Sequence, residues 1–275
     1  MLNPWSRRSL LRISTFAVPL FTLLRGRELF GAEMLNSQND SLQPVTDLYP
    51  TQAPELVRET VTVAHFDLNR VKELVEARPS LACAAWDWGF GDWESALGAA
   101  SHMGNRPIAE YLIAKGARPS LFSATMLGQL EVVKAFVAAQ PGVRSIRGPH
   151  SISLLAHAKA GGQAARPVFE FLQALGGADA EPQVAVTEDD AAAVRGTYIF
   201  GVGANQQIDV TVDRGQVTWT RKGAIGRPLF HLGNRAFYPC GAAAVRISFA
   251  ETAGTMVMTI SDADLVLKAQ RRETK

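Results

Sequence analysis

The heptapeptide RPIAEYL occupies residues 106–112, and RPVFEFL occupies residues 166–172. The copies stand 60 residues apart and keep Arg, Pro, Glu and Leu in place. A proline near a helix start costs no needed hydrogen bond and already has a helical φ. Ile108, Tyr111 and Leu112, spaced by three and four residues, form one apolar face. The phrase therefore predicts the start of an amphipathic helix that recurs along the chain.

Four related helical segments surround the two copies. They begin at Phe66, Gly104, Gly128 and Ala164, which lie 38, 24 and 36 residues apart. A helix pair that recurs in this way exposes an apolar face that only a neighbouring pair can cover. The 24-residue step leaves no room for a β-hairpin between the second and third pairs. We expect an α-solenoid of about four helix pairs over residues 53–178.

This region resembles the ankyrin repeat, whose common form is T-P-L-H-x-A-A-x-x-G-H-x-E-V-V-x-L-L-L-x-x-G-A. Residues 95–105, SALGAASHMGN, follow the first-helix register, and Lys115-Gly116-Ala117 supplies the closing Gly-Ala. No T-P-L-H is intact, and Phe66 stands where glycine is usual. The resemblance implies a protein-binding array with a concave face bordered by finger loops, the connections between successive pairs.

The pattern becomes β-like from Arg195. The stretch IDVTVDRGQVTWTR (208–221) alternates apolar and polar residues around an Asp-Arg-Gly turn. Seven or eight short strands predict a small antiparallel β-barrel or sandwich over 195–275, since closure removes exposed edges. Residues 179–194 read as a linker with a short helix from Glu188 to Val194, capped by Thr187. The predicted fold class is α+β with two domains. The further strand candidates are 227–232, 235–239, 244–250, 255–261 and 263–271.

The β region resembles the small lipocalin-like domain often appended to bacterial serine β-lactamase-like hydrolases. The resemblance rests on the strand pattern from RGTYIF (195–200) to TMVMTIS (255–261) and covers nearly all of 190–272. It implies an accessory domain without catalytic residues. The hydrolase motifs S-x-x-K and G-x-S-x-G do not occur in the sequence. We therefore expect no enzymatic activity.

Residues 1–32 resemble a bacterial twin-arginine export signal. Arg7 and Arg8 precede an apolar stretch, Ile13–Leu24, that is too short to cross a ~30 Å hydrocarbon core. The resemblance implies a periplasmic or otherwise extracytoplasmic protein without a stable transmembrane anchor, unless the signal stays uncleaved. If Met34 is the true start, the protein is cytoplasmic. Residues 33–52 read as a polar linker.

The charge pattern gives no indication of a nucleic-acid surface. The net charge is +2, but it gathers in the first 32 residues and leaves roughly −2 for the rest. Cys83 and Cys240 lie far apart without CxxC spacing, so we expect two buried thiols rather than a disulfide.

Aromatic residues gather in AAWDWGFGDWESA (84–96). Tryptophan is common at binding hot spots because it buries a large area at low entropic cost. These rings either pack on the first two helix pairs or form a surface that binds a partner. A basic finger loop at 144–153 either contacts an anionic partner or is solvated. The candidate partner-binding residues are Trp86, Trp88, Phe90, Trp93, Arg144, Arg147 and His150.

The five histidines show no metal-binding spacing such as HxxxH, so we expect no metal and no cofactor. His65 and His102 fall at the ends of predicted first helices, and His157 reads as a structural histidine. The predicted function is non-enzymatic: an exported module that binds an unidentified protein through the array. The alternatives are a small-ligand or lipid carrier and an accessory subunit of an extracytoplasmic hydrolase. Inward-pointing Phe230, Phe237 and Phe249 would argue against a carrier.

Overall fold

The structure is a computed structural model that describes residues 48–273, apart from 180–183, 204, 223 and 225. Leu48–Lys275 make up one unit, which contains a helical region and a β region. The predicted export signal and nearly all of the predicted linker at 33–52 lie outside the described residues. Within the described part, no helix is both long enough and apolar enough to cross a membrane.

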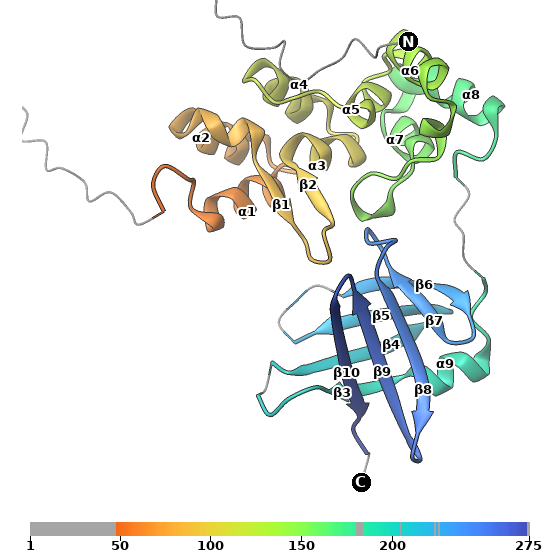
Figure 1. The fold of residues 1–275 in the computed structure, drawn as a ribbon. Coiled ribbons are helices and arrows are strands. Elements are labelled where there is room, and N and C mark those ends of the chain that lie inside the picture. The colour runs from red at the N-terminus through yellow and green to blue at the C-terminus, as the bar shows by residue number, and fades with distance from the viewer. Residues whose placement is uncertain (1–47, 180–183, 204, 223, 225, 274–275) are drawn as a thin grey trace, which may run out of the picture. The chain divides into compact units, whose positions relative to one another are not determined.

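Eight α-helices of the helical region form four consecutive pairs (Figure 1). The second helix of each pair begins two residues after the segment start predicted from the repeat, so the unequal steps along the chain are confirmed. The bounds are α1 Pro54–Val63, α2 Leu68–Ala77, α3 Ala96–His102, α4 Arg106–Ala114, α5 Leu121–Met126, α6 Leu130–Ala139, α7 Leu154–Ala160 and α8 Arg166–Leu175.

The connections between the pairs differ. The first contains a two-stranded hairpin, β1 (Ala85–Asp87) and β2 (Trp93–Ser95). The second runs over residues 115–120 and forms no strand, as the 24-residue step predicts. The third is closed by an isolated bridge between Arg147 and Ser153. The short 3-10 helices are η1 Pro79–Cys83, η2 Pro141–Ser145, η3 Pro149–Ser151 and η4 Gly162–Ala165.

The apolar face of the repeated phrase is buried between neighbouring helices. Ile108 and Leu112 of α4 are fully buried, and so are Val168 and Leu172 of α8. Pro107 lies in the first turn of α4, where the Asn105 side chain accepts a hydrogen bond from the Ile108 N–H. The repeated sequence therefore supplies both the helix start and the stacking surface.

Two glycines allow the second and third helix pairs to approach the fourth pair closely. Gly128 has a φ of +77°, and a Cβ atom there would lie 2.1 Å from the Ala164 carbonyl oxygen. Gly104 has a φ of +70° and is equally close to the Ala160 carbonyl oxygen. Each glycine thus serves both a left-handed turn and a backbone contact.

We expect Gly128→Ala to lower the free energy of unfolding by more than about 3 kcal/mol. About 1–2 kcal/mol comes from the left-handed backbone, and about 2 kcal/mol more from the clash of the new methyl group with the Ala164 carbonyl. Gly116→Ala is the matched control, because Gly116 has a φ of +97° but no atom within 4 Å of its added Cβ. That control should cost only about 1–2 kcal/mol. Urea denaturation measures both variants, and equal losses would contradict the close approach.

The β region is a closed antiparallel barrel of eight strands in the order β10-β3-β4-β5-β6-β7-β8-β9 (Figure 1). Of the two predicted architectures, the barrel is therefore the one observed. The strands are β3 Gly196–Ile199, β4 Gln207–Asp213, β5 Gln216–Arg221, β6 Arg227–Gly233, β7 Ala236–Pro239, β8 Arg246–Thr252, β9 Thr255–Asp262 and β10 Leu265–Arg271.

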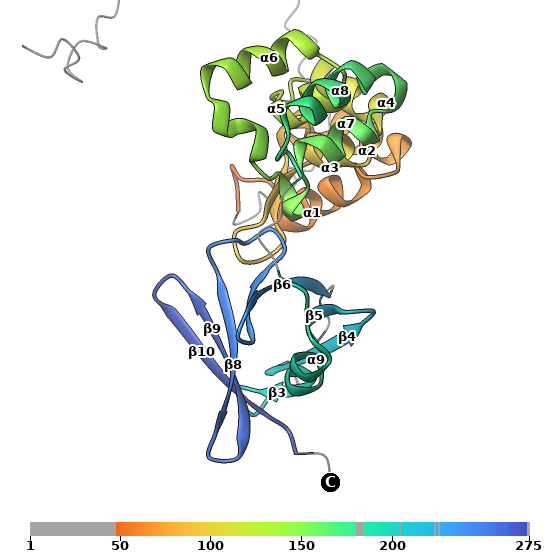
Figure 2. The same cartoon turned by 90° about the vertical axis from the view of Figure 1, so that its right-hand side faces the viewer.

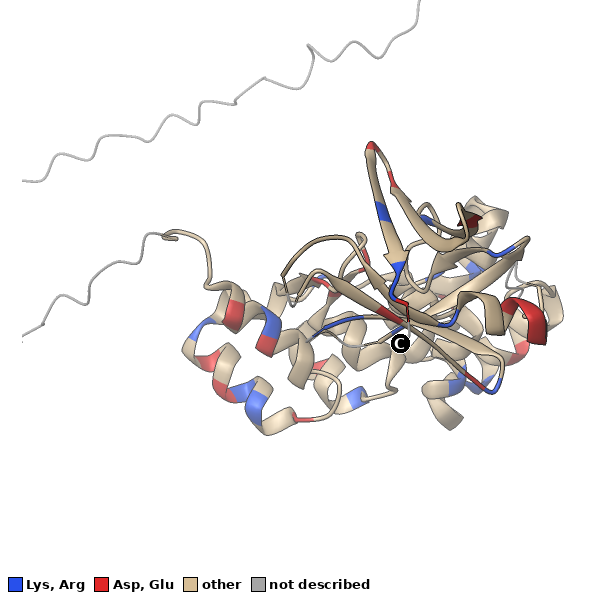
Figure 3. Cartoon of the chain, turned by 90° about the horizontal axis from the view of Figure 1, so that it is seen from below, with Lys and Arg blue, Asp and Glu red and all other residues tan. Residues whose placement is uncertain are grey.

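The predicted short helix is present as α9 (Glu188–Val194). Thr187 caps it by accepting a hydrogen bond from the Asp190 N–H at 3.1 Å, as expected. Val194 at its end joins the apolar core of the barrel, beside which α9 lies in Figure 2. Acidic and basic residues are otherwise interspersed along the helices and strands (Figure 3).

The barrel interior is filled by large side chains. Tyr198, Phe237 and Met258 are fully buried, and Phe249 is buried beside them. Phe230 is only half-buried and packs on Tyr238 outside this cluster. Two of the three phenylalanines that bear on a carrier function thus occupy the core.

Candidate functional site

The finger hairpin (residues 85–95) sorts its aromatic residues onto two faces. Trp86 pairs with Glu94, and Asp87 pairs with Trp93. Paired residues share a face while successive residues alternate, so Trp86, Trp88 and Glu94 face inward and Trp93 faces outward. Burial agrees: Glu94 is fully buried, whereas Trp93 is 63% exposed.

The turn of the hairpin runs through three left-handed residues, Gly89, Phe90 and Gly91. Only glycine adopts this conformation without cost, so the unusual residue is Phe90, with a φ of 60°. Its ring lies 5.4 Å from the ring of Trp219 on β5 and packs against the barrel core. The turn therefore directs an aromatic side chain to another part of the same chain.

Four side chains converge behind the inner face of the hairpin: His65, Glu94, His102 and His150. His65 follows the end of α1, Glu94 lies on β2, His102 ends α3, and His150 lies in η3. The end of α1, α3 and the hairpin lie side by side in Figure 1. Each residue offers one nitrogen or oxygen atom, and these four atoms all lie within 4.8 Å of one another. We call these four residues the His–Glu cluster.

Glu94 is the centre of the His–Glu cluster. Its Oε1 lies 2.9 Å from His102 Nε2. Its Oε2 lies 3.5 Å from His65 Nε2 and 3.3 Å from His150 Nε2. The same oxygen accepts a hydrogen bond from Trp88 Nε1 at 2.8 Å. One buried carboxylate thus faces three imidazoles and an indole.

The outer nitrogens of two of these imidazoles are also bonded. His65 Nδ1 lies 3.1 Å from the Val61 carbonyl oxygen and 3.0 Å from that of Thr62. His150 Nδ1 lies 2.8 Å from Asp92 Oδ2. Carbonyl and ionised carboxylate oxygens only accept, so both Nδ1 atoms carry a proton. These contacts fix the orientation of both rings.

The pKa shifts in the His–Glu cluster favour an ionised Glu94 carboxylate beside a protonated His150. Burial alone would raise the pKa of Glu94, but hydrogen bonds from His102 and His150 lower it to about 2. Burial likewise opposes charge on His150, but hydrogen bonds to Asp92 and Glu94 raise its pKa to about 9. The pKa of Asp92 is lowered by His150 and Arg227, despite burial. At neutral pH the carboxylates are ionised and His150 is protonated.

His157 on α7 lies beside the His–Glu cluster but does not belong to it. Its ring centroid is 6.4 Å from that of His102, and its Nδ1 lies 2.8 Å from the Ser153 carbonyl oxygen. Its Nε2 is buried without a hydrogen-bond partner among the described residues. Burial, with a smaller contribution from His102, lowers the pKa of His157 to about 4.

Because that value lies below the ordinary 6.5, neutral His157 contributes stability above pH 6.5 that is lost as the pH falls towards 4. Between pH 7 and pH 5 we expect His157 to account for a loss of about 2 kcal/mol in the free energy of unfolding. His157→Gln should remove this part of the pH dependence. Urea denaturation of both proteins at pH 7 and pH 5 measures the change, with a chelator present so that no metal ion contributes to stability. If the free energy of unfolding fell equally with pH in wild type and in the His157→Gln variant, the expectation would be contradicted.

The aromatic residues of the predicted finger loop lie in different environments. Trp86 and Trp88 are half-buried and pack on the apolar core of the first two pairs, as the packing interpretation predicts. Phe90 packs on the barrel, and only Trp93 is largely exposed. Asp92, which no motif singled out, is buried and accepts a hydrogen bond from Arg227 Nη1 at 2.9 Å.

The predicted basic finger loop is engaged by its own chain. Arg144 is half-buried on η2, and Arg147 Nη1 donates to the Ser151 carbonyl oxygen at 3.4 Å. His150 joins the His–Glu cluster, and its carbonyl oxygen accepts from Cys240 Sγ at 2.7 Å. Both cysteines are thiols, but the expectation that both are buried was wrong, because Cys83 is exposed and Cys240 is only half-buried.

Sequence reasoning missed the His–Glu cluster because it looked for ligand pairs within single elements. His65 and His102 each lie at the C-terminal end of the first helix of a pair, so stacking brings these two positions together. Their ring centroids lie 4.9 Å apart. Glu94 alternates with Trp93 on a predicted finger loop, which makes it an inward position. A search for polar residues at equivalent repeat positions would have found the two histidines.

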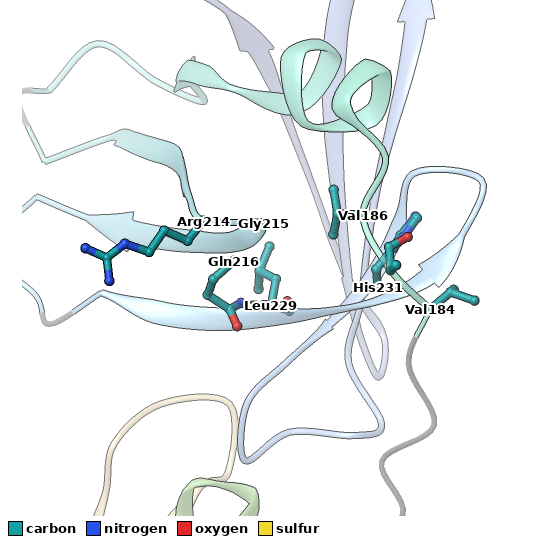
Figure 4. Close-up of a pocket in the computed structure, with 8 residues that line it drawn as sticks. Val184, Val186, Arg214, Gly215, Gln216, Leu229 and His231 are labelled. Carbon is teal, nitrogen blue, oxygen red and sulfur yellow. Dashed lines mark hydrogen bonds between the residues drawn. The ribbon is translucent and has the colours of Figure 1, made fainter.

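A separate pocket lies beside the barrel strands. Figure 4 shows Val184 and Val186 near His231 of β6. The Val184 N–H donates to the His231 carbonyl oxygen, and His231 Nε2 has no hydrogen-bond partner among the described residues. The pocket has a volume of about 300 Å³, at the small end for a ligand site.

Comparison of the chain with protein-family models, curated proteins and solved structures gave no match.

Proposed function

We propose that this chain is a non-enzymatic protein-binding scaffold. The four helix pairs form an ankyrin-like array, and the barrel is a lipocalin-like accessory domain. The observation that carries the proposal is Trp93, an indole 63% exposed on the outer face of the finger hairpin. Tryptophan is enriched among binding hot-spot residues, because burying its large ring on binding releases much water at little entropic cost.

The contacts of the other candidate residues favour a smaller binding surface than the one predicted from the sequence. Trp86, Trp88, Phe90 and His150 are directed to partners within the chain. The side chain of Trp93 instead points away from the inner face of the hairpin, whereas its neighbour in sequence, Glu94, is buried and holds the strand in place. The surface proposed for the partner is therefore the outer face of the finger hairpin, with the neighbouring concave side of the array.

The proposed place of action is outside the cytoplasm, after export by a twin-arginine-type signal. That pathway transports folded proteins, which suits a chain whose helical and β regions bond to each other. Arg227 on β6 donates to Asp92 and to the Trp88 carbonyl oxygen, at 2.9 and 2.7 Å. The filled barrel core argues against the alternative of a carrier with its ligand inside the barrel.

We expect Trp93→Ala to weaken partner binding by about 30-fold, the effect of losing a hot-spot residue of about 2 kcal/mol. Leu265→Ala is the matched control, because Leu265 is a comparably exposed apolar residue (60%) on β10 of the barrel. A photo-crosslinker at position 93 first captures the partner from a native extract. Isothermal titration with the purified partner then compares both variants.

Equal affinity of the Trp93→Ala and Leu265→Ala variants would contradict the proposed surface. So would a crosslinker at position 265 that captures the same protein as one at position 93.

A further inference from the structure

We propose that His65, Glu94, His102 and His150 together bind one divalent transition-metal ion, with Zn²⁺ as the cation that suits these ligands best. This inference does not depend on the proposed partner binding, since all four residues lie behind the finger hairpin rather than on its exposed face.

The spacing of the ligand atoms suits a small cation. A tetrahedral ion with bonds of about 2.1 Å holds its ligands about 3.4 Å apart. The nitrogens of His65, His102 and His150 lie 3.5, 2.9 and 3.3 Å from the nearest Glu94 oxygens. All four ligand atoms fall within 4.8 Å of one another. Only small side-chain movements are needed to surround an ion.

The contacts behind the ligands are those of a built metal site. A metal-bound histidine commonly donates its other N–H to a carbonyl or carboxylate, which fixes the ring and leaves the inner nitrogen for the metal. His65 does this with the carbonyls of Val61 and Thr62, and His150 with Asp92. Trp88 Nε1 in turn orients Glu94. Val61 and Thr62 lie on α1, and Trp88 and Asp92 lie in the finger hairpin, so two separate segments of the chain orient the ligands.

The ligand chemistry favours zinc over harder cations. Three imidazoles and one carboxylate suit Zn²⁺ and neighbouring transition metals, whereas Ca²⁺ and Mg²⁺ prefer sets of oxygen ligands. Four protein ligands complete a tetrahedral shell without a water position, which is typical of structural sites. A structural ion agrees with a scaffold that has no catalytic motif.

Burial separates this site from an ordinary surface cluster. The Glu94 side chain is 0% exposed and that of His102 is 8% exposed. The side chains of His65 and His150 are 19% and 31% exposed, so an ion enters from their side. A bound ion would join the end of α1, the finger hairpin, the end of α3 and the η3 loop through one centre.

The test uses the full chain, stripped with a chelator and then incubated with Zn²⁺. After desalting, we expect one zinc ion per chain by mass spectrometry of the metal. His65→Gln and His150→Gln, which change the two more exposed ligands, should each weaken Zn²⁺ binding by about 100-fold or more. His157→Gln is the matched control, since His157 is a buried neighbour outside the ligand set and its variant should retain one zinc.

A second measurement does not depend on any variant folding. Co²⁺ added to the stripped wild type should give the intense visible absorption of a four-coordinate ion. Less than stoichiometric zinc, equal retention by wild type and the two ligand variants, or the weak absorption of six-coordinate Co²⁺ would each overturn the proposal. The four side chains would then form a network of hydrogen bonds and ion pairs without a metal ion.

Discussion

The helical region is organised around one carboxylate that has no access to water. A buried, ionised Glu94 costs several kcal/mol unless donors surround it. The donors come from the end of α1, the hairpin itself, the end of α3 and the η3 loop. The order of helices, the register of the hairpin and the path of the loop before α7 must therefore all be correct together.

The same hairpin connects the helical region to the barrel. Its turn supplies Phe90 and Asp92 to Trp219 and Arg227, while its strand supplies Glu94 to the histidines. His150 bonds to both carboxylates and so belongs to both groups. Most polar and aromatic side chains of the hairpin are satisfied within the chain, and Trp93 is the exception, at 63% exposure.

The features that sequence reasoning predicted well are those that depend on local periodicity. Pro107, Ile108 and Leu112 carry enough information for a helix start and a buried face, and their copy at 166–172 marks the same helix two pairs further along the chain. Thr187 and the acidic residues after it mark α9 in the same way. Alternation along 208–221 marks strands, but whether the sheet closes depends on pairing of β10 with β3, which no local pattern contains.

The His–Glu cluster could not be predicted by the same means, because its members share no element. His65 and Glu94 meet only after the first two pairs have stacked and the hairpin has folded back. The burial of Cys83 was misjudged for a related reason, since thiols are usually buried but Cys83 ends a 3-10 helix at the surface. Tertiary contacts decide both outcomes, whereas composition and spacing decide neither.

The unequal lengths of the repeats have a consequence for folding. In an array of identical repeats, each pair can stack on the wrong neighbour, and such misassembly is a common failure of repeat proteins. Here the connections of the first, second and third pairs differ in length and content, and Gly104 and Gly128 each fit one particular carbonyl. A pair that docked out of order would lose these close backbone contacts, so the irregular spacing favours one order of stacking.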